Sequence, residues 1–264
     1  MASRTKQKEQ ARAQRLAEEQ ARQARASRQQ RMRMLGGVIL AAVAVVAVLI
    51  AISAGGGKTA TGLQTGAKST KLVSQVTSLL SGIPQAGATL GNPKAPVTMT
   101  YYGDLECPIC KDFTLSGGFP QLVANDVRAG RVKVVYKAFQ TATPSPQTFQ
   151  TQQVAALAAG KQNHFWDYTE LFYREQGAEG TGYVTESYLD GLAAQVPGMN
   201  VSSWRTARND AALTSQVSSD ALAGKTAGVQ GTPTLIFQGP KGQAAAPTGV
   251  PSYSDLQQAI KTVS

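Results

Sequence analysis

The sequence predicts an α/β fold in which a block of helices interrupts a mixed β-sheet, with one transmembrane helix ahead of the folded domain. This fold is predicted by an uncharged apolar run at residues 35–54, a strand, helix and strand pattern at residues 97–139, and a further strand at residues 234–237 beyond a long helical segment. A chain of 264 residues has room for one domain of ordinary size besides a targeting region. We therefore expect a single folded domain.

Residues 1–34 form a basic tail, which we expect in the cytosol. They hold 10 Lys and Arg against 3 Asp and Glu, whereas the rest of the chain holds 16 against 13. Most of the net charge of +10 therefore comes from the tail. Because the folded part is close to neutral, its charge argues against nucleic acid as a partner.

The segment 35–54 reads LGGVILAAVAVVAVLIAISA and predicts a membrane anchor. As a helix, about 20 apolar residues rise roughly 30 Å, which is enough to cross a bilayer core. Arginines precede the segment, the last at Arg33, and the nearest charge after it is Lys58, so the N-terminus is expected in the cytoplasm. The small residues before Gly55 leave a cleaved signal peptide as the alternative, but the length of the run favours an uncleaved single-pass anchor in the cell membrane.

Residues 55–80 are expected to be a flexible spacer between the anchor and the domain. The stretch 55–69 is rich in Gly, Thr and Lys, as linkers are, and residues 72–80 are a candidate for a short helix. The domain is then expected to cover residues 81–264, with a helical insertion at about 147–225.

The first part of the domain predicts a strand, helix and strand unit. Residues 97–102, VTMTYY, are β-branched or aromatic, as in strands, and lead directly to Cys107. Apolar residues from Phe113 to Val127 recur at helical spacing, and residues 131–139, RVKVVYKAF, alternate like a second strand.

Helices are expected to fill the middle of the domain, and a strand and a helix to close it. Residues 148–225 are rich in Ala, Gln and Leu, with an aromatic cluster that follows His164 and is expected in the core. For His164 itself, the only histidine, we expect a surface or capping role. Residues 234–237, TLIF, predict a buried strand, and Ser252 is expected to cap a last helix whose inward residues are Leu256, Ile260 and Val263.

Cys107 and Cys110 are the only cysteines, and two residues separate them. A disulfide across so short a loop would stabilise the fold little. Structural zinc usually takes four ligands, and besides two thiols the chain offers a single histidine, so no metal is expected. Redox chemistry without a bound cofactor is the favoured use of the pair.

The spacing of the pair assigns a role to each cysteine. A sulfur attacks a disulfide as thiolate, and a free thiol with a pKa of about 8.5 is mostly protonated at neutral pH. If Cys107 begins a helix, unpaired backbone N–H groups and the helix dipole stabilise its anion, and Pro108 suits the first helical position. We predict Cys107 as the exposed nucleophile and Cys110, one turn further in, as the shielded resolving thiol.

A proline directly before the last predicted strand adds a second feature to the cysteine pair. Pro233 follows Thr232, and this position suits a cis peptide bond in a tight turn. Four segments are informative together: LGNPKAPVTM at 90–99, YYGDLECPIC at 101–110, HFWDYTELFYREQ at 164–176 and GVQGTPTLIF at 228–237. Through them the sequence resembles, over about residues 81–264, the thioredoxin-like disulfide oxidoreductases of the DsbA type, including membrane-anchored relatives.

The resemblance implies a thioredoxin-like core with an inserted helical domain. It also implies that Thr232 and a cis Pro233 face the cysteine pair and that the backbone at Thr232 pairs with a bound substrate strand. Many relatives carry a buried glutamate at the position of Tyr101. Proton transfer to and from Cys110 could then use Asp104, Glu106, Tyr101 or water, although we expect Asp104 to serve a turn or to cap the helix, and Glu106 to be solvated.

The leading functional hypothesis is an exported protein-disulfide oxidoreductase that oxidises cysteine pairs in secreted proteins. Its partners would be reduced cysteine-containing exported proteins and a quinone-linked membrane protein that reoxidises it, and it would act as a monomer. Pro108 and Ile109 set the redox potential between the cysteines and predict an oxidant of intermediate strength. The alternatives are an extracytoplasmic disulfide reductase or isomerase, or a non-catalytic tethered binding protein with an inert disulfide.

Overall fold

The computed structural model describes residues 61–264. The basic tail, the expected anchor at 35–54 and the first residues of the expected spacer lie outside the described residues. Within residues 61–264, none of the helices combines the length and the apolar character that crossing a membrane requires.

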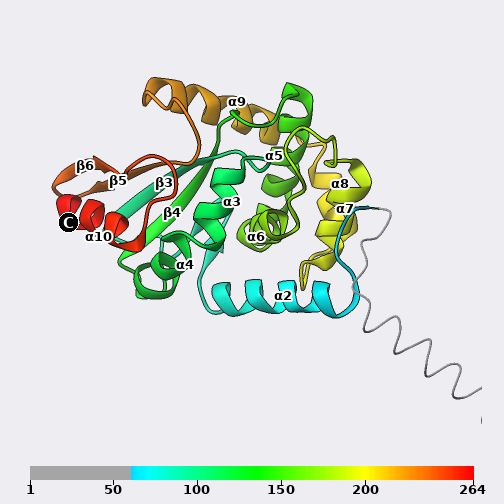
Figure 1. The fold of residues 1–264 in the computed structure, drawn as a ribbon, viewed down its shortest axis with the longest axis horizontal. Helices are drawn as coiled ribbons and strands as arrows, with labels where there is room; N and C mark the ends of the chain where they lie inside the picture. Colours follow the sequence, from blue (N-terminus) through cyan, green and yellow to red (C-terminus); the bar gives the residue numbers. More distant parts are fainter. Residues whose placement is uncertain (1–60) are drawn as a thin grey trace, which may run out of the picture. The chain divides into compact units, whose positions relative to one another are not determined.

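A six-stranded mixed sheet forms the centre of the described domain, with strands in the order β1-β2-β4-β3-β5-β6 (Figure 1). The strands are β1 (Gln85–Ala86), β2 (Thr89–Leu90), β3 (Val97–Gly103), β4 (Val132–Ala138), β5 (Thr234–Gly239) and β6 (Gly242–Ala245). Central β3 pairs in parallel with β4 and antiparallel with β5, and these are the three strands that the sequence predicts. The remaining strands have two to four residues and lie among turn-forming residues, so no periodic pattern reveals them.

Helices surround this sheet, and five of them lie between β4 and β5. Those five are α5 (Pro146–Gly160), α6 (Phe165–Glu175), α7 (Glu186–Gln195), α8 (Val201–Ala207) and α9 (Ala211–Thr226). The predicted helical insertion is therefore confirmed. Outside it lie α2 (Gly66–Leu80), α3 (Pro108–Leu115), α4 (Phe119–Leu122), a π-helical turn η1 (Val123–Val127) and α10 (Tyr253–Val263).

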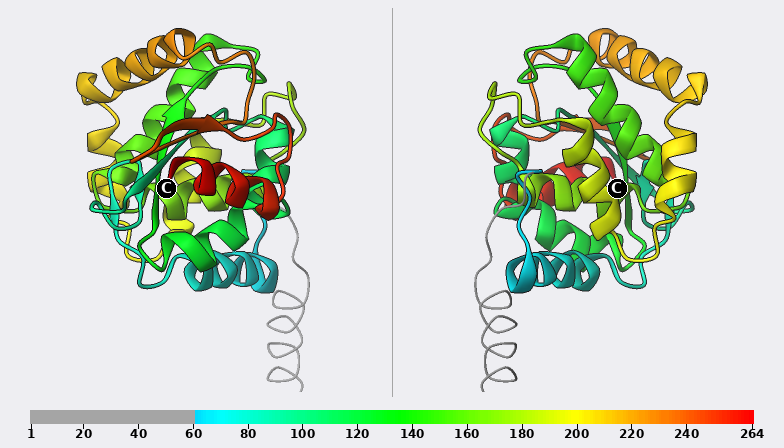
Figure 2. Two further views of the ribbon diagram at one scale, coloured as in Figure 1. Left: turned by 90° about the vertical axis from the view of Figure 1, so that its left-hand side faces the viewer. Right: turned by 90° about the vertical axis from the view of Figure 1, so that its right-hand side faces the viewer.

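Two neighbouring tyrosines of β3 show which helices cover each face of the sheet. Successive side chains of a strand point to opposite faces. Tyr101 packs against Phe113 of α3 and Phe119 of α4, whereas Tyr102 packs against Phe139 at the end of β4. A Cβ atom on Gly224 of α9 would meet both Phe139 and Tyr102, so α9 covers the second face (Figure 2).

Residues 66–80 differ from the expected spacer, because they form the whole of α2. Val76 and Leu80 are buried, and α2 packs along α6. The Arg128 guanidinium also donates to the carbonyls of Leu79 and Ser81, at 2.8 and 2.6 Å. Since this helix contributes to the core, the folded domain begins ahead of residue 81.

The helical face predicted between Phe113 and Val127 is divided into α3, α4 and η1. The break falls at Gly117 and Gly118, which α10 approaches closely. Gly118 donates its N–H to the Pro251 carbonyl at 2.8 Å, and a Cβ there would lie 2.7 Å from the Ser252 carbonyl carbon. Ser252 caps α10 as predicted, with a capping box that includes Asp255.

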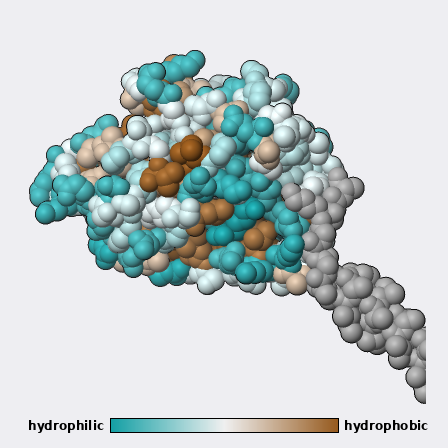
Figure 3. Space-filling view, in the orientation of Figure 1, coloured by the Kyte–Doolittle hydropathy of each residue, from teal (hydrophilic) through white to brown (hydrophobic). Residues whose placement is uncertain are grey.

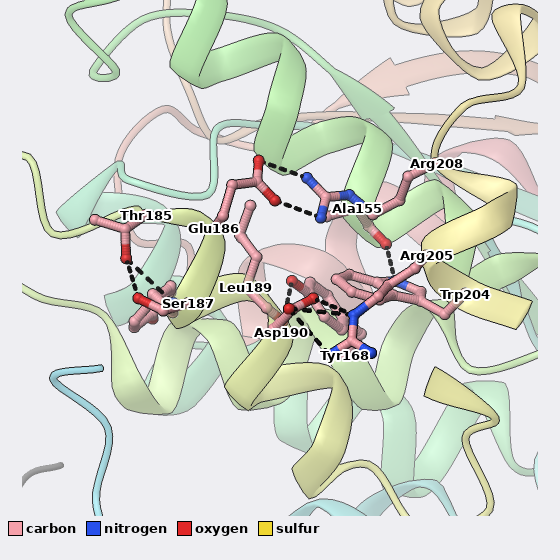
Figure 4. Close-up of polar contacts among 11 residues, drawn as sticks. Ala155, Tyr168, Thr185, Glu186, Ser187, Leu189, Asp190, Trp204, Arg205 and Arg208 are labelled. Atoms are coloured by element: carbon pink, nitrogen blue, oxygen red, sulfur yellow. Dashed lines mark hydrogen bonds and ion pairs between the residues drawn. The ribbon is translucent and has the colours of Figure 1, made fainter. Parts of the chain in front are cut away.

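The helices of the insertion are joined by a buried tryptophan and by ion pairs (Figure 4). Trp204 of α8 is fully buried and donates its indole N–H to the Ala155 carbonyl of α5 at 2.8 Å. Arg208 lies over the Trp204 ring and donates to both carboxylate oxygens of Glu186, at 2.6 and 2.8 Å. Exposed ion pairs stabilise little, so the indole burial holds this corner of the insertion together.

Candidate active site

Cys107 lies where β3 has ended and α3 begins. It occupies the N-cap position of α3 and Pro108 the first turn, as predicted. Proline suits this position because its missing N–H would have had no partner within the helix. The backbone N–H groups of Ile109 and Cys110 are thereby left free to face the sulfur of Cys107.

The two cysteines are both reduced, and both are covered by neighbouring residues. Cys110 is fully buried, as expected for a shielded resolving thiol. The expectation that Cys107 is exposed is wrong, because only 5% of its surface is accessible. The loop that carries Thr232 lies against its sulfur, whereas Ile109, between the cysteines, is 42% exposed.

The two thiols differ strongly in acidity. Hydrogen bonds lower the pKa of Cys107 to about 6, the largest contribution coming from the Cys110 thiol. The Thr232 side chain and the N–H groups of Cys110 and Ile109 act in the same direction, against the opposing effect of burial. Burial, followed by the neighbouring Cys107, raises the pKa of Cys110 well above its ordinary value. The pair therefore combines a stable thiolate with a thiol that stays protonated.

Thr232 and Pro233 face the cysteines across the end of the sheet. Their peptide bond is cis, as the sequence predicts. The Cys107 thiol donates to the Thr232 carbonyl oxygen, with 3.3 Å between sulfur and oxygen. Beside this loop lies a cavity of about 370 Å³ lined by residues 227–234 and by residues of β5, β6 and the segment 245–249.

Tyr101 of β3 lies behind the cysteine pair. Its side chain is fully buried, and its hydroxyl lies 3.1 Å from the Thr114 hydroxyl and 3.4 Å from the Cys110 carbonyl oxygen. Burial raises the pKa of this phenol well above its ordinary value, so it is neutral. Tyr101 is thus a hydrogen-bonding group directly behind Cys110.

The two acidic residues before Cys107 are both buried. Asp104 serves a turn, as expected, by accepting the Glu106 N–H at 3.1 Å, and it also holds the segment 141–143. The expectation that Glu106 is solvated is wrong, because only 2% of its surface is accessible. Burial raises the pKa of its carboxyl, and its Oε2 atom has no hydrogen-bond partner among residues 61–264.

Gln176, at the end of α6, contacts the site in a way that sequence reasoning missed. Its amide donates to the carbonyls of Leu105 and Cys107, at 2.7 and 3.2 Å. The helical insertion therefore contacts the backbone segment that leads into the cysteine pair. Gln176 is the last residue of the segment 164–176 that carries part of the resemblance, but nothing local in the sequence indicates these contacts.

The described residues contain no group of three or more His, Cys, Asp and Glu side chains that could hold a metal ion. His164 stands at the N-cap of α6, with Nδ1 3.2 Å from the Asp167 carboxylate, and the aromatic residues that follow it are buried.

Apolar side chains are exposed near the cysteines. In Figure 3, hydrophobic residues gather near the middle of the face shown, among hydrophilic ones. Ile109 and Val250 are among the exposed large hydrophobic residues, and Val250 directly follows the segment that lines the cavity beside Pro233. Exposed apolar surface at a reactive sulfur is typical of a site that receives another polypeptide.

Comparison with known proteins gives a family match over most of the described domain. A family model described as thioredoxin matches residues 85–262. The disulfide bond formation protein D of Bacillus subtilis (strain 168) is 27% identical over 151 residues, which make up 55% of this chain and 65% of that protein. The match thus spans slightly less than two thirds of that relative's length.

Solved structures with the same fold include two bacterial proteins. Oxidised BdbD from Bacillus subtilis superposes with a TM-score of 0.57 at 23% sequence identity, over 69% of this chain and 96% of that chain. DsbA from Chlamydia trachomatis superposes with a TM-score of 0.55 at 18% identity, over 66% and 89% respectively. At these identities the likeness shows a shared fold.

Proposed function

The chain belongs to the thioredoxin family, and on this basis we propose that it is a protein-disulfide oxidoreductase that oxidises cysteine pairs in exported proteins through a Cys107–Cys110 disulfide. The observation that carries the proposal is the position of Cys107 at the start of α3, between the buried Cys110 and the Thr232 carbonyl, where hydrogen bonds lower its pKa to about 6. The name of the Bacillus subtilis relative, a disulfide bond formation protein, supports the same reaction.

The two thiols suit this exchange in a defined order. A client thiolate attacks the Cys107 sulfur of the disulfide, the bond between the cysteines breaks, and Cys110 leaves and takes up a proton. A second client thiolate then attacks the client sulfur of the mixed disulfide, and Cys107 leaves as a thiolate. Two electrons pass from the client to the cysteine pair, and one client proton goes to solvent.

The stable thiolate favours the oxidising direction. A sulfur of low pKa is a good leaving group, and stabilising the reduced form makes a dithiol pair more oxidising. Between the cysteines, Pro108 lacks an N–H, and the Ile109 side chain offers no polar group to the thiolate. We therefore propose a potential between that of thioredoxin, about −270 mV, and that of DsbA, about −120 mV.

The proposed substrates are reduced polypeptides. An extended client segment beside Cys107 would pair with the backbone at Thr232, next to Pro233, and rest on the apolar surface around Ile109 and Val250. The proposed place of action is outside the cytoplasm, on a protein anchored by residues 35–54 and reoxidised by a quinone-linked membrane partner. The apolar run at 35–54 and the arginines before it support this location.

The test combines a redox titration with trapping of client proteins. Equilibration against glutathione gives the potential, and a Cys110→Ser variant is expected to accumulate mixed disulfides with disulfide-containing peptides, because the Cys107 thiolate attacks the peptide disulfide and no Cys110 thiol remains to release the peptide. Cys107→Ser is the matched control and should trap nothing. A potential as low as that of thioredoxin would instead indicate a reductase, and absence of trapping would indicate a binding protein with an inert cysteine pair.

A further inference from the structure

Asp104 carries a buried carboxylate that fixes a neighbouring loop. Its side chain is fully buried, and Oδ2 accepts the backbone N–H groups of Thr141, Ala142 and Thr143, each at 2.9 Å. Oδ1 accepts the Thr143 hydroxyl and the Glu106 N–H. Because three successive N–H groups converge on one carboxylate, the backbone of this loop is held against the end of β3.

The loop presents the Thr141 side chain to the segment that carries Pro233. The hydroxyls of Thr141 and Thr232 are hydrogen-bonded to each other, although the residues are 91 positions apart. Thr141 is exposed and Thr232 half-buried, and either oxygen can be the donor. Which one donates depends on what else the Thr232 hydroxyl contacts.

Thr232 lies against the Cys107 sulfur. Its carbonyl oxygen accepts the Cys107 thiol at 3.3 Å, and hydrogen bonding by its side chain contributes to the lowered pKa of that thiol. When the thiol loses its proton, the bond to the carbonyl is lost, and a Thr232 hydroxyl that stabilises the anion has to donate to it and accept from the Thr141 hydroxyl. These two hydroxyl hydrogen bonds then point toward the sulfur, and each strengthens the other.

We propose that Thr141 is a positioning residue for thiol-disulfide exchange, which turns the Thr232 hydroxyl toward the Cys107 sulfur from a loop that Asp104 holds. The inference rests on the proposed function, since it concerns the sulfur that performs the exchange. Its consequence is that α5 is connected to the redox centre, because the Gln152 amide of α5 donates at 2.6 Å to the Thr143 hydroxyl of the loop that presents Thr141.

The test follows the Cys107 thiolate by its ultraviolet absorbance during a pH titration of the reduced, full-length protein. Thr141→Val is expected to raise the midpoint by about half a pH unit, equal to a roughly threefold weaker stabilisation of the thiolate. Thr141→Ser should restore the midpoint, because the hydroxyl returns. Thr226→Val is the matched control, since Thr226 is exposed on α9 and donates to the Leu222 carbonyl.

A double-mutant cycle tests whether Thr141 acts on the Cys107 sulfur through Thr232, in a relay of hydrogen bonds, or independently of Thr232. In a Thr232→Val background, Thr141→Val is expected to cause no further shift, because the relay is already interrupted. Equal shifts in both backgrounds, or no shift from Thr141→Val alone, would overturn the inference. If the wild-type midpoint is near 6 while Thr141→Val leaves it unchanged, the proposed function stands and only the relay is lost. A wild-type midpoint in the ordinary thiol range overturns both.

Discussion

Cys107 and Thr232, 125 positions apart in the sequence, meet at the end of the sheet with 3.3 Å between the Cys107 sulfur and the Thr232 carbonyl oxygen. The contact joins the start of α3 to the turn before β5, which are held together because β3 and β5 are hydrogen-bonded neighbours. The cysteine at the start of α3 and the turn that holds the cis peptide bond are thus brought together by the pairing of two central strands.

Alkylation should report the difference in acidity between the thiols. We expect the rate of Cys107 modification by iodoacetamide to be half-maximal near pH 6, because the thiolate is the reactive form. Cys110 should stay unmodified in the folded protein, since it is buried and its pKa is raised. Mass spectrometry of the quenched protein checks both expectations, and a half-maximal rate near pH 9 would contradict them.

The stability of the reduced protein should increase as pH rises from about 6 to about 9. The folded pKa of Cys107, about 6, lies below its ordinary value of 9.0, so this contribution is complete above pH 9 and is lost as pH falls through 6. The oxidised protein has no thiolate and lacks this dependence. Urea unfolding of the two forms and of a reduced Cys107→Ala variant measures the difference, and parallel pH profiles would argue against a stabilised thiolate.

Tyr101→Phe should lower the free energy of unfolding by about 1 to 2 kcal/mol, because the buried Thr114 hydroxyl loses its partner. Tyr188→Phe is a matched control, since the buried Tyr188 hydroxyl has no hydrogen-bond partner among residues 61–264. Urea unfolding of both variants provides the comparison. Equal losses of unfolding free energy in the two variants would mean that the Tyr101 hydrogen bonds do not stabilise the protein.

A chain that begins at residue 81 should be less stable than one that begins at residue 61. Removing α2 uncovers the surface that Val76 and Leu80 bury, and each such side chain contributes about 1.5 to 3 kcal/mol. Thermal unfolding of the two chains measures the loss. Equal melting temperatures would show that α2 is no more than a spacer.

Gly224→Ala should destabilise the protein by about 1 to 3 kcal/mol, although alanine is the better helix former. The added methyl group would collide with the Phe139 ring and lie 3.3 Å from Tyr102. Ser219→Ala, on the exposed side of α9, is the control and should not destabilise the protein. A stabilised Gly224→Ala variant would mean that Phe139 moves aside freely.

Local features of the sequence were sufficient for the framework of the site. The strands at 97–102, 131–139 and 234–237 follow from β-branched and alternating residues, and the start of α3 follows from Pro108 directly after Cys107. The cap at Ser252 is equally local, because its partner Asp255 is three residues away. Such features arise from residues that are close together in the sequence, so they can be predicted from it.

Distant segments decided the rest. By itself the sequence determined the elements of the proposed site, a cysteine pair at a helix start and a proline at a strand start. Only the tertiary structure decided that Cys107 and Glu106 are buried, that residues 66–80 belong to the core, and that Thr141 and Gln176 contact the site. The physical reason is that burial and long-range hydrogen bonds depend on which remote segments the sheet and the insertion bring together. The spacing of residues along the chain does not show which segments these are.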